Sequence, residues 1–476
     1  MNSTSRFTAA HALALAVVLA AGAGALAAGT RAAEPGQLPR PADLRALEDV
    51  ARRELADTNT PGAAIAIVSG DSVVYSNGFG IASVDAAEPV TPDMLFRLGS
   101  TTKMFTAAAV VSLAEEGKLR LDEPIGARVP GLDPSIAKLT PHQLLTHSAG
   151  LRDEAVMEGL HDDGALAAGV RAMTGDMFFA EPGRLFSYAN PGFWIAGRLA
   201  ESVDGRPYAD VMTARLFTPL GMIRTTVRPT MAMTWPLAQG HDVNAGKPRV
   251  MRPAADNAAN WPAGSIFSSA ADLSRFARAF LNGGRIDGKQ ALSRSLIETL
   301  STPHIDVPGA SNPKYGYGLT IVTRRGVRFA EHGGSRAGYG SFISMAPAER
   351  VGIVVVANRT GSSLPKTVMK AAEMMLPLLP ESTPSPRAPV ALEPGEAERY
   401  AGKYAQAGGD AGLSIIVRNG ALALNTGTQE TPISKVGPNR FEVVRAGVPE
   451  DVVFVLGNDG RAEFVYRGTR ALARLR

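Results

Sequence analysis

The stretch FRLGSTTKMFTAAAVVSLAEEGKL, residues 96–119, poses the main question about this chain. Residues 104–114 are apolar almost all round, which predicts a helix that is buried rather than one that lies on a surface. Lys103 stands at the head of this helix, three residues after Ser100. Burying a lysine is costly unless its charge is paired or its proton is lost. Catalysis is one reason for a protein to accept that cost.

Ser100 and Lys103 form a candidate nucleophile and base. Residues three apart share a helix face, so the lysine can reach the serine hydroxyl. A desolvated, neutral lysine could remove the hydroxyl proton, and the helix N-terminus would favour the developing negative charge. The alternative is a serine that caps the helix beside a lysine that extends to solvent. Ser-x-x-Lys is a weak pattern, since it recurs at 135–138 and 363–366, where we interpret Ser363 as an ordinary helix N-cap.

The segment RLFSYANPGFWIAGRLA, residues 184–200, supplies possible partners for this pair. Tyr188 and Asn190 are two apart at the end of an extended segment, so their side chains project to the same side. A phenol beside an ammonium group can shuttle protons, and an amide can orient both the lysine and a substrate.

A third candidate element is FAEHGGSRAGYGSFISM, residues 329–345. His332 ends a predicted strand, and the glycines after it would let a backbone or a substrate approach closely. Backbone N–H groups here could complete an oxyanion hole with the N–H of Ser100. The alternative is a glycine-rich hairpin connection with a surface histidine. We interpret another histidine, His147, as a cap on helix carbonyls before Gly150 rather than as a catalytic base.

Strand-like runs occur on both sides of a helical region that spans about 100–310. Before it lies a helix from Pro41 and two strands, and after it four strands and a helix at about 363–376. This order predicts one sheet built from both ends, with an inserted helical lobe: an α/β (α+β) domain over residues 41–377. The predicted strands are 62–70, 72–80, 319–324, 327–332, 341–346 and 351–358.

The remainder of the chain predicts a second, smaller domain. Residues 378–394 are proline-rich and polar, which is typical of a semi-rigid linker. Beyond them, short alternating runs are separated by Asn-Gly and Asp-Gly turns, which predicts a small all-β domain over 395–476.

The first 33 residues predict a secretory signal peptide. Arg6 precedes an uncharged Ala/Leu/Val run at about 9–29, and small-residue cleavage sites follow. The alternative is an uncleaved membrane anchor, for which the interior glycines are poorly suited. We therefore expect a periplasmic or secreted bacterial protein, with no stable membrane span after cleavage.

Composition excludes several other functions. The chain has 476 residues, a net charge of +4 and no cysteine, which rules out disulfides and cysteine zinc sites. No long Lys/Arg block is present, so we expect no nucleic-acid partner. The seven histidines show no metal-ligand spacing. We therefore predict no metal and no cofactor, and a small molecule or peptide as the substrate.

Taken together, Ser100-Thr101-Thr102-Lys103, Tyr188-Ala189-Asn190 and His332-Gly333-Gly334 resemble the three motifs of active-site-serine β-lactamases and penicillin-binding proteins, in the right order. The Tyr-x-Asn form resembles the class C-like branch. The resemblance covers about residues 41–375 and implies a β-lactamase/transpeptidase-like fold, an antiparallel sheet flanked by helices with an all-helical lobe. The C-terminal β domain is similar to the lipocalin-like appendages of some members.

The resemblance also implies roles for single residues. Ser100 would form an acyl-enzyme, with Lys103 and Tyr188 as base and acid. The N–H groups of Ser100 and Ser335 would form the oxyanion hole. The residues implied to bind substrate are Asn190, His332, Gly334 and Ser335.

One departure from the family pattern bears on the substrate. His332 stands where true β-lactamases usually have the lysine of Lys-Thr-Gly, and a largely neutral histidine holds a carboxylate less well. We therefore expect a hydrolase of small esters, amides or D-amino-acid peptides, activities known for related sequences with His-x-Gly. A true β-lactamase or DD-carboxypeptidase is the alternative. A non-catalytic protein that binds penicillin or peptidoglycan fragments is an alternative of another class.

Overall fold

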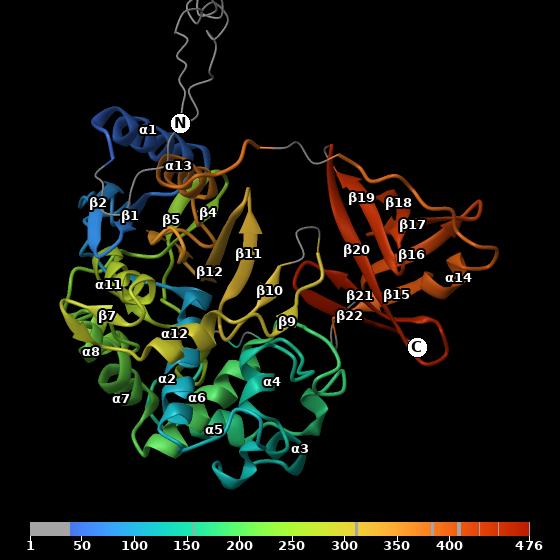
Figure 1. Ribbon diagram of the computed structural model, residues 1–476, viewed down its shortest axis with the longest axis horizontal. Coiled ribbons are helices and arrows are strands. Elements are labelled where there is room, and N and C mark those ends of the chain that lie inside the picture. Colours follow the sequence, from blue (N-terminus) through green and yellow to red (C-terminus); the bar gives the residue numbers. More distant parts are fainter. Residues whose placement is uncertain are drawn as a thin grey trace, which may run out of the picture.

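The computed structural model describes residues 39–154, 156, 158–309, 313–381, 385–406, 411–427, 429–445 and 447–475. The predicted signal peptide, residues 1–33, lies outside the described residues. The described part of the chain forms a mixed α/β body and a closed β-barrel beside it (Figure 1). The expected fold class is confirmed in both parts.

The body is built on an eight-stranded antiparallel sheet in the order β2-β1-β14-β13-β12-β11-β10-β9. Strands from the two ends of the body meet inside it, since β1 pairs with β14 over seven residues. In sheet order the strands are β2 (Ser72–Gly80), β1 (Gly62–Ser69), β14 (Val351–Ala357), β13 (Tyr339–Ala346), β12 (Val327–Arg336), β11 (Thr320–Arg324), β10 (Lys314–Tyr315) and β9 (Ile305–Asp306).

Both faces of the sheet are covered, so β1 is buried along its whole length. Ile65 and Ile67 face α1 (Pro41–Asp57) and α13 (Pro365–Met375), which form one outer layer (Figure 1). Ala64 and Ala66 face the opposite core, into which α11 (Ala270–Leu281) packs. This double cover explains why the strand is apolar at every position rather than at alternate ones.

The start of α13 differs from the expectation. Leu364, not Ser363, is the residue before the helix, and its φ is 48°. The first N–H groups of α13 are instead satisfied by Glu54 of α1, whose buried carboxylate accepts from the N–H of Lys366 (2.9 Å) and of Thr367 (2.7 Å). The interpretation of Ser363 as an N-cap is therefore wrong, because a side chain from a distant helix satisfies this terminus.

The helical lobe is centred on α2 (Thr102–Glu115), which is buried along most of its length, as its all-round apolar pattern predicts. It is enclosed by α6 (Asn190–Asp204), α10 (Trp261–Gly264) and α12 (Arg294–Ser301). The other short helices of the lobe are α3 (Pro134–Ala137), α4 (Pro141–Leu145), α5 (Ala165–Arg171), α7 (Tyr208–Met212), α8 (Thr218–Leu220) and α9 (Pro229–Ala232).

The C-terminal part is an eight-stranded antiparallel barrel that closes through pairing of its first and last strands. Its strands are β15 (Gly402–Ala405), β16 (Ala411–Arg418), β17 (Ala421–Asn425), β18 (Glu430–Gly437), β19 (Arg440–Arg445), β20 (Val448–Leu456), β21 (Ala462–Arg467) and β22 (Arg470–Arg474). The barrel has its own core, built around Tyr404, Phe441 and Phe454. No helix in the described part of the chain is both long and apolar enough to span a membrane.

The barrel is docked on the body through β21 and β22, on the side of the barrel that faces the body in Figure 1. Leu185 of the body packs with Phe464 and Tyr466 in one apolar cluster. At its edge the Arg184 guanidinium pairs with Glu463 of β21 (2.5 Å).

Candidate active site

Ser100 and Lys103 are paired at the centre of the body. Ser100 lies in a short 3₁₀ turn, Gly99–Thr101, that leads directly into α2. The Lys103 Nζ atom is 3.2 Å from Ser100 Oγ, 2.7 Å from Asn190 Oδ1 and 2.8 Å from the Ala263 carbonyl oxygen. A neutral amine fits these partners, because its two N–H groups can donate to the two acceptors while its lone pair accepts from the serine hydroxyl.

The surroundings of Lys103 favour that neutral form. Its side chain is fully buried, and this burial lowers the pKa of Lys103 from 10.5 to about 7. The negative charge of Asp153 opposes this change in part, and the positive charge of Arg470 adds to it. A substantial fraction of the lysine is therefore neutral near pH 7.

Tyr188 lies beside the pair. The Lys103 Nζ atom is 4.9 Å from the centre of its ring. Burial raises the pKa of Tyr188 well above its usual value, an effect that the nearby Ser100 hydroxyl partly offsets. Among the described residues, the Tyr188 hydroxyl is buried and has no hydrogen-bond partner of good geometry. The phenol is thus held neutral, with its proton free to be donated.

His147 supports Tyr188 and does not cap a helix. It is buried, adopts a φ of 56°, and its ring lies 4.1 Å from the ring of Tyr188. Its Nδ1 atom accepts a hydrogen bond from the N–H of Ala189 at 3.1 Å. The sequence-based capping interpretation is therefore wrong, since the imidazole contacts a segment about 40 residues away rather than carbonyls of its own helix.

Asn190 begins α6 and bridges Lys103 to Asp153. The Asn190 Oδ1 atom accepts from Lys103, while its Nδ2 atom donates to Asp153 Oδ1 at 3.0 Å. The backbone N–H of Asn190 donates to the same carboxylate oxygen at 2.8 Å. These partners fix which end of the amide faces the lysine.

His332 lies in the middle of β12 rather than at a strand end, because β12 continues to Arg336. Its side chain is buried, with Nδ1 2.6 Å from the Gly333 carbonyl oxygen and Nε2 3.0 Å from the Tyr315 hydroxyl. Burial, together with the charge of Lys103, lowers the pKa of His332 to about 3. The imidazole is therefore neutral at physiological pH.

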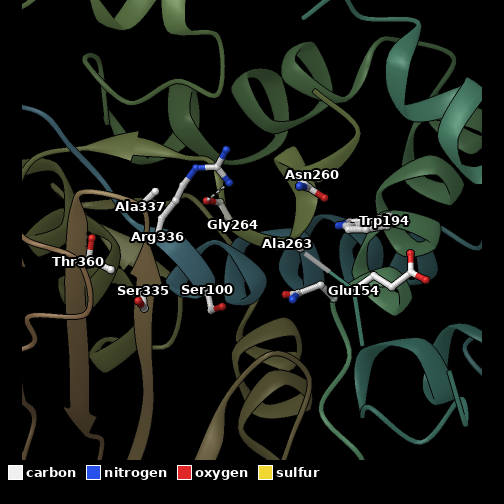
Figure 2. Close-up of a pocket in the computed structure, with 11 residues that line it drawn as sticks. Ser100, Glu154, Trp194, Asn260, Ala263, Gly264, Ser335, Arg336, Ala337 and Thr360 are labelled. Atoms are coloured by element: carbon white, nitrogen blue, oxygen red, sulfur yellow. Dashed lines mark hydrogen bonds between the residues drawn. The ribbon is translucent and has the colours of Figure 1, made fainter. Parts of the chain in front are cut away.

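Gly334 lets β12 lie directly against the turn that carries Ser100. A Cβ atom on Gly334 would be 1.8 Å from the Leu98 carbonyl oxygen. Gly99 makes the same kind of approach from the other side, since a Cβ there would be 2.6 Å from the Ser335 nitrogen. This close packing sets Ser100 and Ser335 side by side (Figure 2).

Gly334→Ala should therefore lower the rate of covalent labelling of Ser100 by about 100-fold, because a displacement of about 1 Å at a reacting group has that effect. The measurement is the rate of covalent labelling by a fluorophosphonate at pH 8. Gly333→Ala is the matched control, since its Cβ would make an ordinary 3.4 Å contact with Phe342 and the variant should react at nearly the wild-type rate. Equal rates for the two variants would contradict this role of Gly334.

A pocket of about 250 Å³ opens over Ser100. Figure 2 shows Ser100 and Ser335 at its base, Arg336 on one wall, and Glu154 and Trp194 on the opposite wall. The remaining lining residues are Asn190, Asn260, Ala263, Gly264, Ala337 and Thr360. His332 and Gly334, expected to bind substrate, are not among the residues that line it.

Arg336 gives one wall of this pocket a positive charge. Its side chain is 4% exposed, and the carboxylate nearest to it, Asp256, is 3.7 Å away and already paired with Arg97 at 2.5 Å. The Arg336 Nε atom has no partner among the described residues. Burial and the charge of Arg97 lower the pKa of Arg336 to about 9, which is the mark of a buried cation without a full counter-charge.

The part of the chain that the structure describes contains no group of three or more His, Cys, Asp or Glu side chains placed to hold a metal ion. The polar groups around Ser100 are hydroxyls, amides, one amine, the Arg336 guanidinium and the Glu154 carboxylate. This set suits acyl transfer, in which a hydroxyl attacks a carbonyl and N–H groups receive the negative oxygen.

This fold and the Ser100–Lys103 pair place the chain in the serine β-lactamase and penicillin-binding-protein class. The chain belongs to the beta-lactamase family, whose model matches residues 47–373.

Individual proteins are also similar to this chain. Protein flp of Staphylococcus aureus strain MW2 is 28% identical over 328 residues, which are 68% of this chain and 64% of that protein, so the chain spans less than two thirds of this relative's length. Penicillin-binding protein 4 of Amycolatopsis lactamdurans is 30% identical over 63% of this chain and 81% of that protein. The structure of the octameric penicillin-binding protein homologue from Pyrococcus abyssi matches with a TM-score of 0.64 and 25% identity, over 91% of this chain and 99% of that chain.

Sequence reasoning missed several residues of the site, among them Asp153, Arg336 and Arg470. Arg336 could have been noticed, because it follows the His-Gly-Gly-Ser segment directly. Asp153 and Arg470 have no such signal, since each is an ordinary surface residue type in a turn-rich segment. Only the fold brings Asp153 to Asn190 and Arg470 to Asp153.

Proposed function

We propose that this protein is a serine hydrolase that acts through an acyl-enzyme on Ser100. The observation that supports it most directly is the contact between the buried Lys103 amine and the Ser100 hydroxyl, at the base of an open pocket. The substrates we propose are small esters, amides or D-amino-acid peptides.

In the first half of the reaction, Ser100 Oγ attacks the substrate carbonyl while its proton passes to the neutral amine of Lys103. The negative oxygen of the tetrahedral intermediate is held by the N–H groups of Ser100 and Ser335. The bond to the leaving group then breaks, and the leaving group receives the proton from Lys103 directly or through the Tyr188 hydroxyl. An acyl-Ser100 ester and a neutral amine remain.

In the second half, water attacks the ester carbonyl and loses one proton to Lys103. Collapse of the intermediate releases the acid product and returns the proton to Ser100 Oγ, which restores the starting enzyme.

We assign the base to Lys103 rather than to Tyr188 because burial acts on the two groups in opposite senses. Burial disfavours a charged lysine and thereby yields the free amine, whereas it disfavours a phenolate and thereby keeps the tyrosine protonated. Near neutral pH the amine can accept a proton and the phenol can only donate one.

The rate of Ser100 labelling should follow the ionisation of Lys103. The reactive form is the deprotonated lysine, so the rate should rise with pH through about 7, the pKa of Lys103, and level off above it. The measurement is the second-order rate constant for a fluorophosphonate from pH 5.5 to 9.5, corrected for hydrolysis of the reagent. A rate that stays low to pH 8 and is still rising steeply at pH 9.5 would mean that the lysine is not desolvated, which contradicts its role as a base.

The substrate proposal is tested by an activity panel of p-nitrophenyl esters, D-alanyl peptides and nitrocefin on the purified protein. Faster turnover of esters or D-alanyl peptides than of nitrocefin supports it. A non-catalytic binding protein would turn over none of them and would not be labelled at Ser100.

A β-lactamase or DD-carboxypeptidase is a second candidate, which Arg336 favours. A buried guanidinium without a full counter-charge on the pocket wall is suited to a substrate carboxylate. In this proposal the Arg336 charge serves in place of the lysine of Lys-Thr-Gly, the position at which this chain has His332. Nitrocefin turnover that exceeds ester turnover, and falls in Arg336→Gln, would favour this candidate.

A further inference from the structure

The contact between barrel and body reaches the active site itself. Three successive residues of the body each share a hydrogen bond with the β21–β22 hairpin. The Phe186 carbonyl accepts from the Tyr466 hydroxyl at 2.7 Å, and the Ser187 hydroxyl accepts from the N–H of Ala471 at 3.3 Å. The third is Tyr188, whose backbone N–H donates to the carbonyl of Thr469 at 3.0 Å.

Arg470 extends this contact toward the lysine. Its Nε atom donates to Asp153 Oδ2 at 2.7 Å, and a terminal nitrogen lies 2.5 Å from the same oxygen. The other oxygen of Asp153 accepts from Asn190, whose Oδ1 accepts from Lys103. An unbroken line of hydrogen bonds thus connects a barrel side chain to the amine beside the nucleophile.

We propose that the barrel completes the active site, with Arg470 as a positioning residue that holds Asp153, and through it the Asn190 amide, against Lys103. The proposal deepens the function proposed above, because it rests on Lys103 acting as the base.

The first part of this role is geometric. Asn190 can face Lys103 with its oxygen or with its NH₂ group, and only the oxygen accepts from the amine. The Asp153 carboxylate is an acceptor only, so it requires the NH₂ group on its own side and thereby turns the oxygen to Lys103. Arg470 binds the carboxylate oxygen that Asn190 does not use, which holds the Asp153 side chain in this orientation.

The second part is electrostatic. The groups that act on Lys103 from neighbouring elements are Asp153, Arg470, His147 and His332, and Glu154 lines the pocket nearby. Burial lowers the pKa of both histidines, so they are neutral. Asp153 without Arg470 would leave an unbalanced negative charge that favours the ammonium form of Lys103.

The test measures fluorophosphonate labelling of Ser100 against pH in full-length wild-type protein and three variants. In Arg470→Gln the midpoint of the acid limb should rise by about 0.5–1 pH unit, with labelling about two- to sixfold slower at pH 7. In Asp153→Asn the midpoint should fall, because this variant removes the negative charge that favours the ammonium form of Lys103. A purely structural role for the pair would not move the midpoint in opposite directions.

Arg184→Gln is the matched control. Among the described residues, it removes a second ion pair between barrel and body, Arg184–Glu463, which is not bonded to the Lys103 network. Its midpoint should equal that of the wild type. The same midpoint in Arg470→Gln and Arg184→Gln would overturn the proposal. An unchanged midpoint in Asp153→Asn would also overturn it, and this variant can be measured even if Arg470→Gln does not fold. Absence of labelling in the wild type would instead overturn the proposed function.

Discussion

Ser100→Ala should abolish both turnover and covalent labelling. The variant lacks the atom that forms the acyl bond in the proposed mechanism, so we expect a loss of at least about 10⁴-fold in kcat/KM, down to what the remaining site contributes by binding alone. The fold should persist, because the Ser100 hydroxyl bonds to Lys103, and that amine keeps its contacts with Asn190 and Ala263 when the hydroxyl is removed.

The measurement is labelling followed by mass spectrometry, with thermal unfolding as the check of the fold. Ser135→Ala is the control, since it removes the serine of another Ser-x-x-Lys segment, whose hydroxyl bonds to Asp133 rather than to a lysine. This control should react like the wild type. Wild-type hydrolysis by Ser100→Ala would show that the acyl-enzyme mechanism is wrong.

Lys103→Met should lower kcat/KM nearly as much as Ser100→Ala does. Methionine retains an unbranched side chain of similar length in a fully buried site, so the lobe should stay packed while the base is lost. We expect kcat/KM to fall by about 10³–10⁴-fold, the upper end of what a positioned base contributes. The double variant with Ser100→Ala should lose little more activity than Ser100→Ala alone, because the two residues act as one unit.

Lys366→Met provides the comparison for this variant. That lysine also ends a Ser-x-x-Lys segment, but its amine is exposed and pairs with Asp57. Its removal should leave the rate unchanged. If Lys103→Met kept more than about a tenth of the wild-type rate, proton removal from Ser100 would have to be assigned to another group.

The sheet and the central helix could be predicted from the sequence because their signals are local. β1 is apolar at almost every position and α2 is apolar all round because each is buried on every side. The spacing of apolar residues in a segment therefore predicts which of its faces are buried. The pairing of Ser100 with Lys103 was predictable for the same reason, since three-residue spacing on a helix determines which side chains meet.

The parts that sequence reasoning missed depend on contacts between distant segments. The first N–H groups of α13 bond to Glu54, which lies more than 300 positions earlier in the sequence. The local pattern around α13 therefore pointed to Ser363 instead. Glycines after His332 suggested a strand end, although Gly334 serves close packing within a continuing strand. Asp153 and Arg470 are 317 positions apart, and no local pattern relates them.

That long separation has a consequence for how the protein is assembled. Closing a loop of 317 residues carries a large entropic cost. The contact therefore becomes favourable only after both of its ends belong to folded units. The body and the barrel each have a core of their own, so each can collapse before they touch. The contact between Arg470 and Asp153 then marks docking of one domain on the other. During refolding, the reactivity of Ser100 would accordingly report the arrival of the barrel, while circular dichroism reports the earlier formation of helices and strands.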